Sequence, residues 1–285
     1  MGWRPMSDFV LEQLVQCLRP VKGLMALVLG GSRARGTAGL DSDYDLGLYY
    51  DTAAPLDVVQ IRSVLEPLVA DRRTTIITEP GQWGPWIDGG AWLRIDGKKV
   101  DLLYRDLSRV REVIEACRAG DVSMHYQPGH PHGFCSAIWM GEVALCLPLI
   151  DSAGVLAELK KLTEPYPAKL QDGLIRRFHW EVGFSIENAE FAVARDEQTH
   201  IGGCAYRALC CIAQVLFAVN NRYLINEKGA LAETETLPQS IPRIGGAAKE
   251  IWAAVGLSDF KRALKLLRGL SLELDRIVAR NRGTV

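Results

Sequence analysis

Two short motifs near the N-terminus contain residue types that bind phosphate and metal ions. The first is the turn Gly30-Gly31-Ser32, which follows an apolar run from Leu24 to Leu29 that is typical of a buried strand. Because glycines have no Cβ atom, the backbone can turn sharply there and bring exposed amides close to phosphate oxygens. A short helix beginning near Ser32 would add the positive end of its dipole, and Arg33 would add a full charge. The turn is therefore predicted to hold the phosphates of a nucleoside triphosphate.

The second motif puts two carboxylates on one face of the next expected strand, residues 44–50. Side chains alternate along a strand, so Asp43 and Asp45 share one side and Tyr44 points to the other. The two aspartate Cα atoms would lie roughly 6–7 Å apart, and their carboxylates can converge on Mg²⁺, which also binds substrate phosphates. Bare carboxylates repel each other, so a cation is the natural partner. The alternative is an ordinary Gly-Ser loop followed by a solvated acidic turn, and the presence of both motifs in this order favours the phosphate and metal site over it.

Two other glycine motifs are excluded by inspection. A P-loop needs Lys and then Ser or Thr after its last glycine, whereas Thr37 and Ala38 follow Gly36. The dinucleotide pattern G-x-G-x-x-G is absent, and the acidic pair comes too soon to bind a ribose. NAD chemistry is therefore not expected.

The order Gly31-Ser32, about ten residues, then Asp43-x-Asp45 resembles the signature of the DNA polymerase β type nucleotidyltransferase superfamily. That resemblance implies a third carboxylate on a later strand. Asp96-Gly97 predicts the turn of a hairpin, and Asp101 lies between apolar residues in the returning strand. An acidic residue within a strand that otherwise looks buried should be paired or bound to a metal, so Asp101 is the candidate. The alternative is that it faces water at a strand edge.

Composition limits the classes of function. The 285 residues suffice for two domains, and the net charge of −1 argues against a general nucleic-acid surface. Small substrates are favoured over polymers. No apolar span has membrane length and the N-terminus shows no signal pattern, so a cytoplasmic protein is expected. The seven cysteines, an odd number without C-x-x-C pairing, predict reduced thiols.

Periodicity predicts a fold in two parts, with a boundary near residue 150. Residues 1–150 are expected to form an α+β (α/β) catalytic domain with a mixed sheet. Its strands are expected near 24–29, 44–50, 73–78, 92–96 and 99–104, and its helices near 7–19, 56–70 and 107–119. Residues 151–285 are expected to form an all-α helical bundle, with helices over 170–195, 204–220 and 260–277.

This organisation resembles bacterial two-domain enzymes that adenylylate small molecules, among them the aminoglycoside nucleotidyltransferases. The resemblance implies an acceptor between the domains and basic side chains lent by the helical domain to the triphosphate. Lys228 and Arg222 are candidates for that role, and a charged loop that only closes the bundle is an equal alternative. The general base toward the acceptor hydroxyl is left open between Asp101, Glu181 and Glu187.

The expected reaction is transfer of a nucleoside monophosphate to a hydroxyl of a small-molecule acceptor, with release of pyrophosphate. ATP or another nucleoside triphosphate would be the donor, and two Mg²⁺ ions would be held by Asp43, Asp45 and Asp101. Two other classes stay open. One is a regulatory nucleotide-binding module without turnover, and the other is an enzyme that nucleotidylates a protein or a tRNA.

Two further segments have competing interpretations. Trp83, Trp86 and Trp92 precede the strand with Asp101 and could stack on a sugar or a base, although core packing explains them equally well. His130 and His132 have a spacing seen in metal sites, but no ligand set with zinc-like spacing accompanies them. A loop near the substrate is favoured over a zinc site.

Overall fold

The chain folds into two compact units in a computed structural model that describes residues 8–39, 41–69 and 75–283. The sheet unit comprises Met1–Glu115 and Trp139–Pro165, and the helical unit comprises Ala116–Ile138 and Tyr166–Val285. This division differs from a single boundary at residue 150. Residues 116–138 group with the C-terminal helices, and residues 151–165 group with the sheet.

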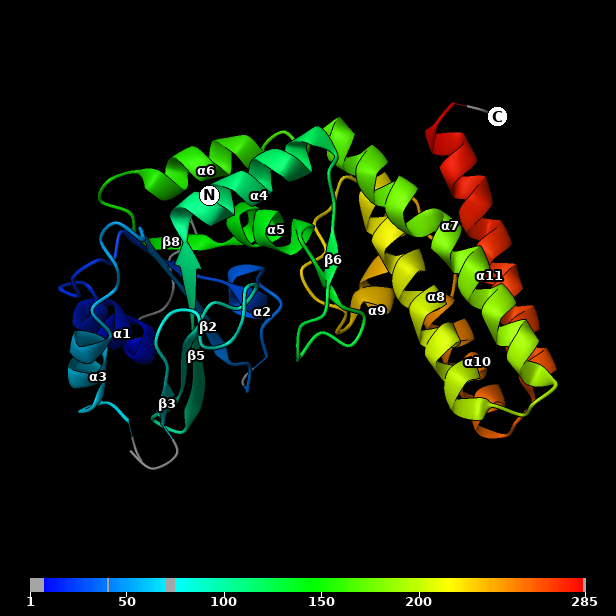
Figure 1. Cartoon of the computed structure of the whole chain (residues 1–285), viewed down its shortest axis with the longest axis horizontal. Coiled ribbons are helices and arrows are strands. Elements are labelled where there is room, and N and C mark those ends of the chain that lie inside the picture. The colour runs from blue at the N-terminus through cyan, green and yellow to red at the C-terminus, as the bar shows by residue number, and fades with distance from the viewer. Residues whose placement is uncertain (1–7, 40, 70–74, 284–285) are drawn as a thin grey trace. The chain divides into compact units, whose positions relative to one another are not determined.

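The sheet unit is built on a six-stranded sheet in which β2 and β5 are parallel neighbours and the other pairs are antiparallel (Figure 1). The mixed sheet and the helical region that follows confirm the predicted fold class. In spatial order the strands are β3 (Ile76–Ile77), β4 (Gly90–Ile95), β5 (Lys98–Asp106), β2 (Tyr44–Tyr50), β1 (Ala26–Leu29) and β8 (Leu147–Ile150). Residues 70–74, where the expected helix 56–70 ends and the expected strand 73–78 begins, lie outside the described residues.

A two-residue turn joins β4 to β5, as predicted. Asp96 and Gly97 have φ angles of 48° and 75°, and Ile95 pairs with Lys98 across the hairpin. Two successive left-handed residues match the twist of the flanking strands, and Asp-Gly is a preferred pair for that turn. The turn sets the register that places Asp101 in the middle of β5.

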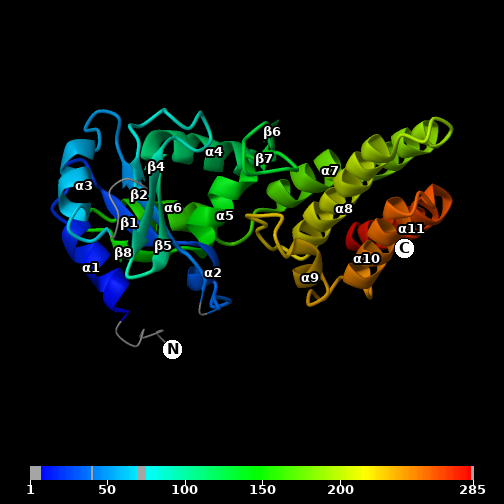
Figure 2. The same ribbon diagram turned by 90° about the horizontal axis from the view of Figure 1, so that it is seen from below.

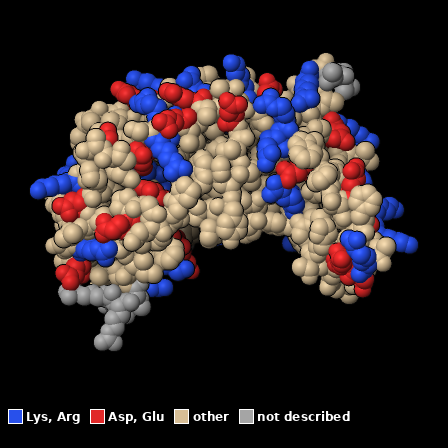
Figure 3. All heavy atoms as spheres, viewed as in Figure 1, with Lys and Arg blue, Asp and Glu red and all other residues tan. Residues whose placement is uncertain are grey.

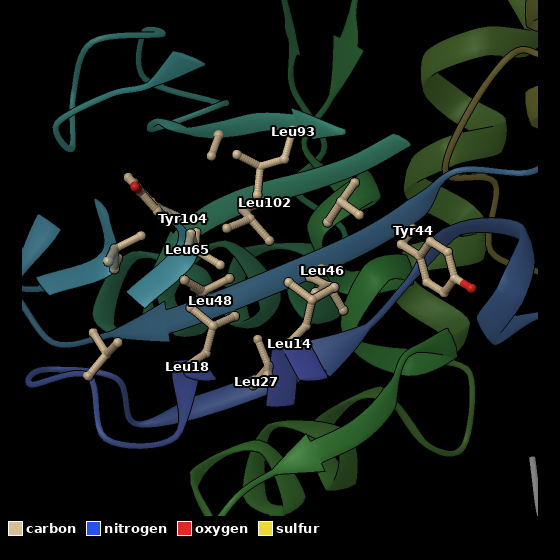
Figure 4. Packing of buried hydrophobic residues seen from close by; sticks show 14 of the residues in the cluster. Leu14, Leu18, Leu27, Tyr44, Leu46, Leu48, Leu65, Leu93, Leu102 and Tyr104 are labelled. Atoms are coloured by element: carbon tan, nitrogen blue, oxygen red, sulfur yellow. The ribbon is translucent and has the colours of Figure 1, made fainter. Parts of the chain in front are cut away.

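One face of the sheet packs against α1 (Phe9–Leu18) and α3 (Val58–Leu65) (Figure 4). Leu14 and Leu18 of α1 meet Leu46 and Leu48 of β2 in this core, and all four side chains are at most 1% exposed. Because strand side chains alternate, the residues between these leucines point to the opposite face. That second face of the sheet is therefore the one that carries Asp45.

The second face is covered where β2 and β5 end. Arg105 of β5 is 3% exposed, and its Nε and Nη2 atoms each donate to Glu142 at 3.0 Å. Glu142 belongs to α5 (Ala137–Leu145), and the unit also contains most of α4 (Leu107–Ala119) and α6 (Val155–Thr163). The sequence did not predict α5, β8 or α6.

The helical unit consists mainly of α7 (Ala168–Val193), α8 (Gln198–Val219), α9 (Ala230–Thr234), α10 (Ile244–Gly256) and α11 (Phe260–Asn281) (Figure 2). It also contains a small hairpin of β6 (Met124–His125) and β7 (Phe134–Cys135). Helix α8 is long and apolar enough to cross a membrane, but 67% of its apolar window is buried within the protein. This burial is typical of the central helix of a soluble bundle. All seven cysteines are free thiols.

Candidate active site

A tight turn follows β1 at the edge of the second face. Gly30 leaves the strand with its N–H donating to the carbonyl of Asp45 at 2.7 Å, and the four-residue helix α2 (Gly31–Ala34) begins directly after it. The N–H of Thr37 donates to the Ser32 carbonyl at 3.0 Å and closes the loop. The predicted strand, turn and short helix are therefore all present. They bring the Gly-Ser motif beside the first residues of β2.

Gly31 touches the Asp45 carboxylate so closely that no side chain fits between them. Its φ angle is +59°, and a Cβ atom added to it would lie 1.8 Å from Oδ2 of Asp45. Left-handed backbone of this kind is unfavourable for residues other than glycine. Glycine is therefore favoured at this position for two reasons: it tolerates the left-handed backbone conformation, and it leaves the space that the carboxylate occupies.

The aspartates of the two strands are neighbours in the sheet. Asp45 of β2 and Asp101 of β5 are directly paired in the parallel ladder, and both are half-buried. Adjacent strands lie about 4.8 Å apart, and paired residues point to the same face. Asp43 lies one residue before β2. If the alternation of side chains along the strand extends to it, Asp43 points to the same side as Asp45 and away from the buried Tyr44. The structure therefore pairs two of the three predicted carboxylates, Asp45 and Asp101, on one sheet face.

The donor set suits a hard divalent cation, since all three side chains offer carboxylate oxygens. Among the described residues, no group of three or more His, Cys, Asp or Glu side chains is gathered tightly enough to form a metal cage from protein atoms alone. Mg²⁺ commonly takes one or two carboxylates and completes its shell with water and substrate phosphate. The arrangement fits a metal that is bound together with a triphosphate.

Arg33 has partners within the turn itself. Its guanidinium lies 3.8 Å from the ring centre of Tyr44, and it donates to the carbonyls of Ser42 and Asp43 at 2.8 and 3.2 Å. It also lies 3.9 Å from Asp8, whose carboxylate accepts from the Tyr44 hydroxyl. Burial, together with that hydrogen bond, raises the pKa of Tyr44 to about 12. Arg33 thus fixes the backbone of the segment that carries Asp43. Sequence spacing suggested that Arg33 binds phosphate, and it did not indicate this structural role.

The other predicted polar residues belong to the helical unit. Lys228 and Arg222 are exposed, and the backbone N–H of Lys228 donates to Asn226 Oδ1 at 2.8 Å. Glu181 is held by Arg207 at 2.5 Å, so its negative charge is already paired. Glu187 lies exposed on α7. These four residues therefore belong to the helical unit, whereas the three aspartates belong to the sheet unit.

The tryptophan segment divides into two environments. Trp86 is buried, with its ring 5.1 Å from that of Trp139 in a tilted arrangement, and therefore belongs to the core. Trp83 and Trp92 stack on each other with centroids 4.7 Å apart, and Trp92 is 50% exposed. Core packing explains Trp86, but it does not explain the exposed ring of Trp92 and its stacking on Trp83.

The two histidines line a cavity of about 430 Å³ in the helical unit, formed by residues 124–133 and Arg207. His130 lies 3.6 Å from Glu227. His132 is 3% exposed, and neither of its ring nitrogens has a hydrogen-bond partner among the described residues. Burial, together with the nearby positive charge of Arg207, lowers its pKa to about 4. Within the part of the chain that the structure describes, these histidines belong to no metal-binding group.

Comparison with known proteins bears on the sheet unit. Residues 11–118 match the family model described as a nucleotidyltransferase domain, a segment that contains the glycine turn and all three aspartates. Among solved structures, a nucleotidyltransferase-like protein from Exiguobacterium sibiricum 255-15 aligns over 95% of this chain and 78% of its own, with 10% identity and a TM-score of 0.44. No curated protein sequence gives a significant match. Residues 11–118 are therefore similar to nucleotidyltransferase domains, in agreement with the resemblance to the DNA polymerase β type superfamily that the sequence motifs predict.

Proposed function

We propose that the protein transfers a nucleoside monophosphate, AMP from ATP, to a hydroxyl of a small-molecule acceptor and releases pyrophosphate. One observation carries this proposal: Asp45 and Asp101 are paired on adjacent strands, and the Asp45 carboxylate packs against Gly31 of the phosphate turn. A loop that binds phosphate and two carboxylates that can bind a metal thus lie within one strand spacing of each other. Transfer of a nucleotidyl group requires both together.

The residues of the turn and the strands have separate roles in this reaction. The amides of Gly31 and Ser32 bind the terminal phosphates, whereas the N–H of Gly30, which the sequence also suggested for this role, already donates to the Asp45 carbonyl. Asp43, Asp45 and Asp101 would hold Mg²⁺, which neutralises charge on the departing pyrophosphate. Asp101 accepts the proton of the attacking hydroxyl as its oxygen bonds to the α-phosphorus and the bond to pyrophosphate breaks. Because the backbones of Asp45 and Asp101 are held in the sheet ladder, the strands that carry these carboxylates need little reorganisation during the reaction.

Two further proposed roles concern residues of the helical unit. Lys228 remains a proposed ligand of the triphosphate, because it is an exposed cation in the loop that follows α8. Glu181 is a weaker candidate for the base than Asp101, since Arg207 already binds its carboxylate. We also expect the protein in the cytoplasm, where ATP is plentiful and thiols stay reduced.

Two alternatives are distinguished by their products. A regulatory module would bind ATP without releasing pyrophosphate, and it would have no need of the third carboxylate at Asp101. Modification of tRNA calls for a basic surface, whereas positive and negative side chains occur together over each unit on the face shown in Figure 3, and the net charge is −1. A small acceptor is therefore favoured.

Substitution of the carboxylates tests the proposal. We expect Asp45→Asn or Asp43→Asn to reduce pyrophosphate release from ATP by at least about 10²-fold while the melting temperature changes little, because a charged metal ligand becomes neutral. Asp41→Asn is the matched control, since it removes an exposed carboxylate from the same acidic loop. Pyrophosphate release is measured by a coupled phosphate assay with a panel of aminoglycosides, lincosamides, nucleotides and sugars. Near-normal turnover in Asp45→Asn would contradict the assignment.

A further inference from the structure

We infer that Trp92, backed by Trp83, binds the acceptor, and that the acceptor is a cyclic molecule whose flat ring face stacks on this pair. The inference rests on the proposed nucleotidyl transfer. It concerns the half of the reaction that the glycine turn and the aspartates leave open. The arguments come from the register of the sheet, the direction of attack, and the way the tryptophans are held.

The sheet register places Trp92 beside Asp101 on the same face. Trp92 of β4 pairs directly with Asp101 of β5, which in turn pairs with Asp45 of β2. Along β4 the exposed side chains are those of Trp92 and Arg94, and Leu93 between them is buried in the core. Directly paired residues share a face, so these three side chains form one row across three strands.

The order of this row matches the direction of attack. Across the sheet the elements run from the turn after β1, through Asp45 and Asp101, to Trp92. In phosphoryl transfer the attacking and leaving oxygens lie roughly in line on opposite sides of the phosphorus. If pyrophosphate leaves over the glycine turn, the hydroxyl must approach from the side of Asp101. The body of the acceptor then lies over β4, about one strand spacing, or ~4.8 Å, beyond Asp101.

The two tryptophans form a supported surface. Their rings are 25° from parallel, and half of Trp92 remains exposed. A ring of this kind offers a large apolar contact at a small entropic penalty, because it has only two rotatable bonds. Stacking on Trp83 further restricts Trp92. A preorganised aromatic face favours ligands with a flat face of their own, such as a pyranose or an aromatic ring.

The loop before β4 fixes the position of Trp83. Asp88 accepts from the backbone N–H of Gly81 at 3.0 Å and from the hydroxyl of Tyr50 at 2.6 Å, which ties the loop to the end of β2. A Cβ atom on Gly90 would lie 3.0 Å from Trp83 and 1.8 Å from the carbonyl of Leu102. The absence of a side chain at Gly90 therefore lets the loop and Trp83 close onto the strand.

Three acceptors that differ in ring structure test the inference with radiolabelled ATP. The probes are methyl β-glucopyranoside, 4-hydroxybenzyl alcohol and acyclic sorbitol, which separate a sugar ring, an aromatic ring and the absence of a ring. We expect at least one cyclic probe to be labelled at least about tenfold more efficiently than sorbitol, the factor that one aromatic stack supplies. Equal labelling of sorbitol overturns the inference.

Variants of Trp92 separate stacking from a general loss of activity. Trp92→Ala should raise the KM of the cyclic probe about tenfold and leave the KM of ATP unchanged, and Trp92→Phe should restore most of the loss. Trp180→Ala, which removes an exposed tryptophan from α7, is the control. An increased KM for ATP in Trp92→Ala would assign the pair to the nucleobase and overturn the inference.

A binding measurement distinguishes this inference from the proposed function. In the Asp45→Asn variant, the preferred cyclic probe should still quench tryptophan fluorescence. In the double variant that also carries Trp92→Ala, this quenching should be lost. If a cyclic probe quenches the fluorescence but the unmodified protein releases no pyrophosphate, only the proposed nucleotidyl transfer is contradicted. If pyrophosphate release does not depend on Trp92, or if neither cyclic probe quenches the fluorescence, only the proposed acceptor surface is contradicted.

Discussion

Replacement of Gly31 by alanine tests the most unusual contact in the site. The added Cβ would lie 1.8 Å from Oδ2 of Asp45 and 2.7 Å from its Cγ. Because real Cβ atoms essentially never approach another atom within 3.0 Å, the carboxylate has to move by more than 1 Å. Its backbone cannot follow easily, because the Asp45 carbonyl accepts from Gly30 and the residue is paired in the ladder with Asp101. The side chain must therefore rotate away from the position it now holds.

The expected losses in stability and in activity differ greatly. Alanine at a φ of +59° is destabilised by about 1–2 kcal/mol, which lowers the melting temperature by roughly 2–8 °C. Metal ligands tolerate displacements of only about 0.2 Å, and a misplacement of about 1 Å reduces the rate of a reaction by about 10²-fold. We therefore expect Gly31→Ala to reduce pyrophosphate release by at least about 10²-fold in a protein that remains folded at 25 °C.

A second glycine in the same loop provides the matched control. Gly36 has a φ angle of +71°, and an added Cβ would meet no atom within 4 Å. Gly36→Ala should therefore lower the melting temperature as much as Gly31→Ala but keep most of the activity. Circular dichroism melts and the pyrophosphate assay measure the two effects separately. Equal activity in the two variants would refute the argument that Gly31 makes room for the carboxylate.

Two further predictions concern buried charge. Glu142→Gln leaves the guanidinium of Arg105, which is 3% exposed, without its counter-charge, so we expect urea denaturation to show a loss of about 3–5 kcal/mol. Glu190→Gln, which disrupts the exposed pair with Arg268, should lose less than about 1 kcal/mol, and equal losses would contradict the difference in burial. Folding favours the neutral form of His132, because it lowers the pKa of the imidazole from the usual 6.5 to about 4. As the pH falls, the unfolded chain therefore binds a proton at this residue before the folded protein does. The contribution of His132 to the free energy of unfolding should be fully present above pH 6.5 and should fall by about 3 kcal/mol toward pH 4. His132→Phe should remove this part of the decline. The control variant at an exposed histidine, His200→Gln, should leave it unchanged.

Much of the sheet and the placement of the aspartates followed from sequence patterns alone. Alternation in residues 44–50 located β2, and Asp96-Gly97 located the hairpin that positions Asp101. These features are local, because strand periodicity and turn chemistry depend on neighbouring residues. The pairing of Asp45 with Asp101 follows once the strands are placed side by side, although the two residues are more than fifty positions apart.

The features that were missed depend on tertiary contacts. Helix α5 is buried over most of its length, so its sequence AIWMGEVAL lacks the polar face by which amphipathic helices are recognised. Strand β8 is short and contains Pro148, which normally argues against a strand but is tolerated at a sheet edge. The contact between Arg33 and Tyr44 depends on how the turn folds back onto β2. No spacing rule predicts such a contact.

Strand β8 has a consequence for how the sheet unit can be synthesised and dissected. It covers the outer edge of β1, whose residues Ala26–Leu29 are all buried, yet it lies beyond residue 118, where the nucleotidyltransferase match ends. On the ribosome, β1 must wait for more than a hundred further residues before its edge is paired. A fragment cut at residue 118 would keep the phosphate turn and the aspartates but present a bare apolar edge, the kind of strand that templates aggregation. The smallest soluble fragment with an intact site is therefore expected to extend through α6, and to include residues 116–138 that fold with the other unit.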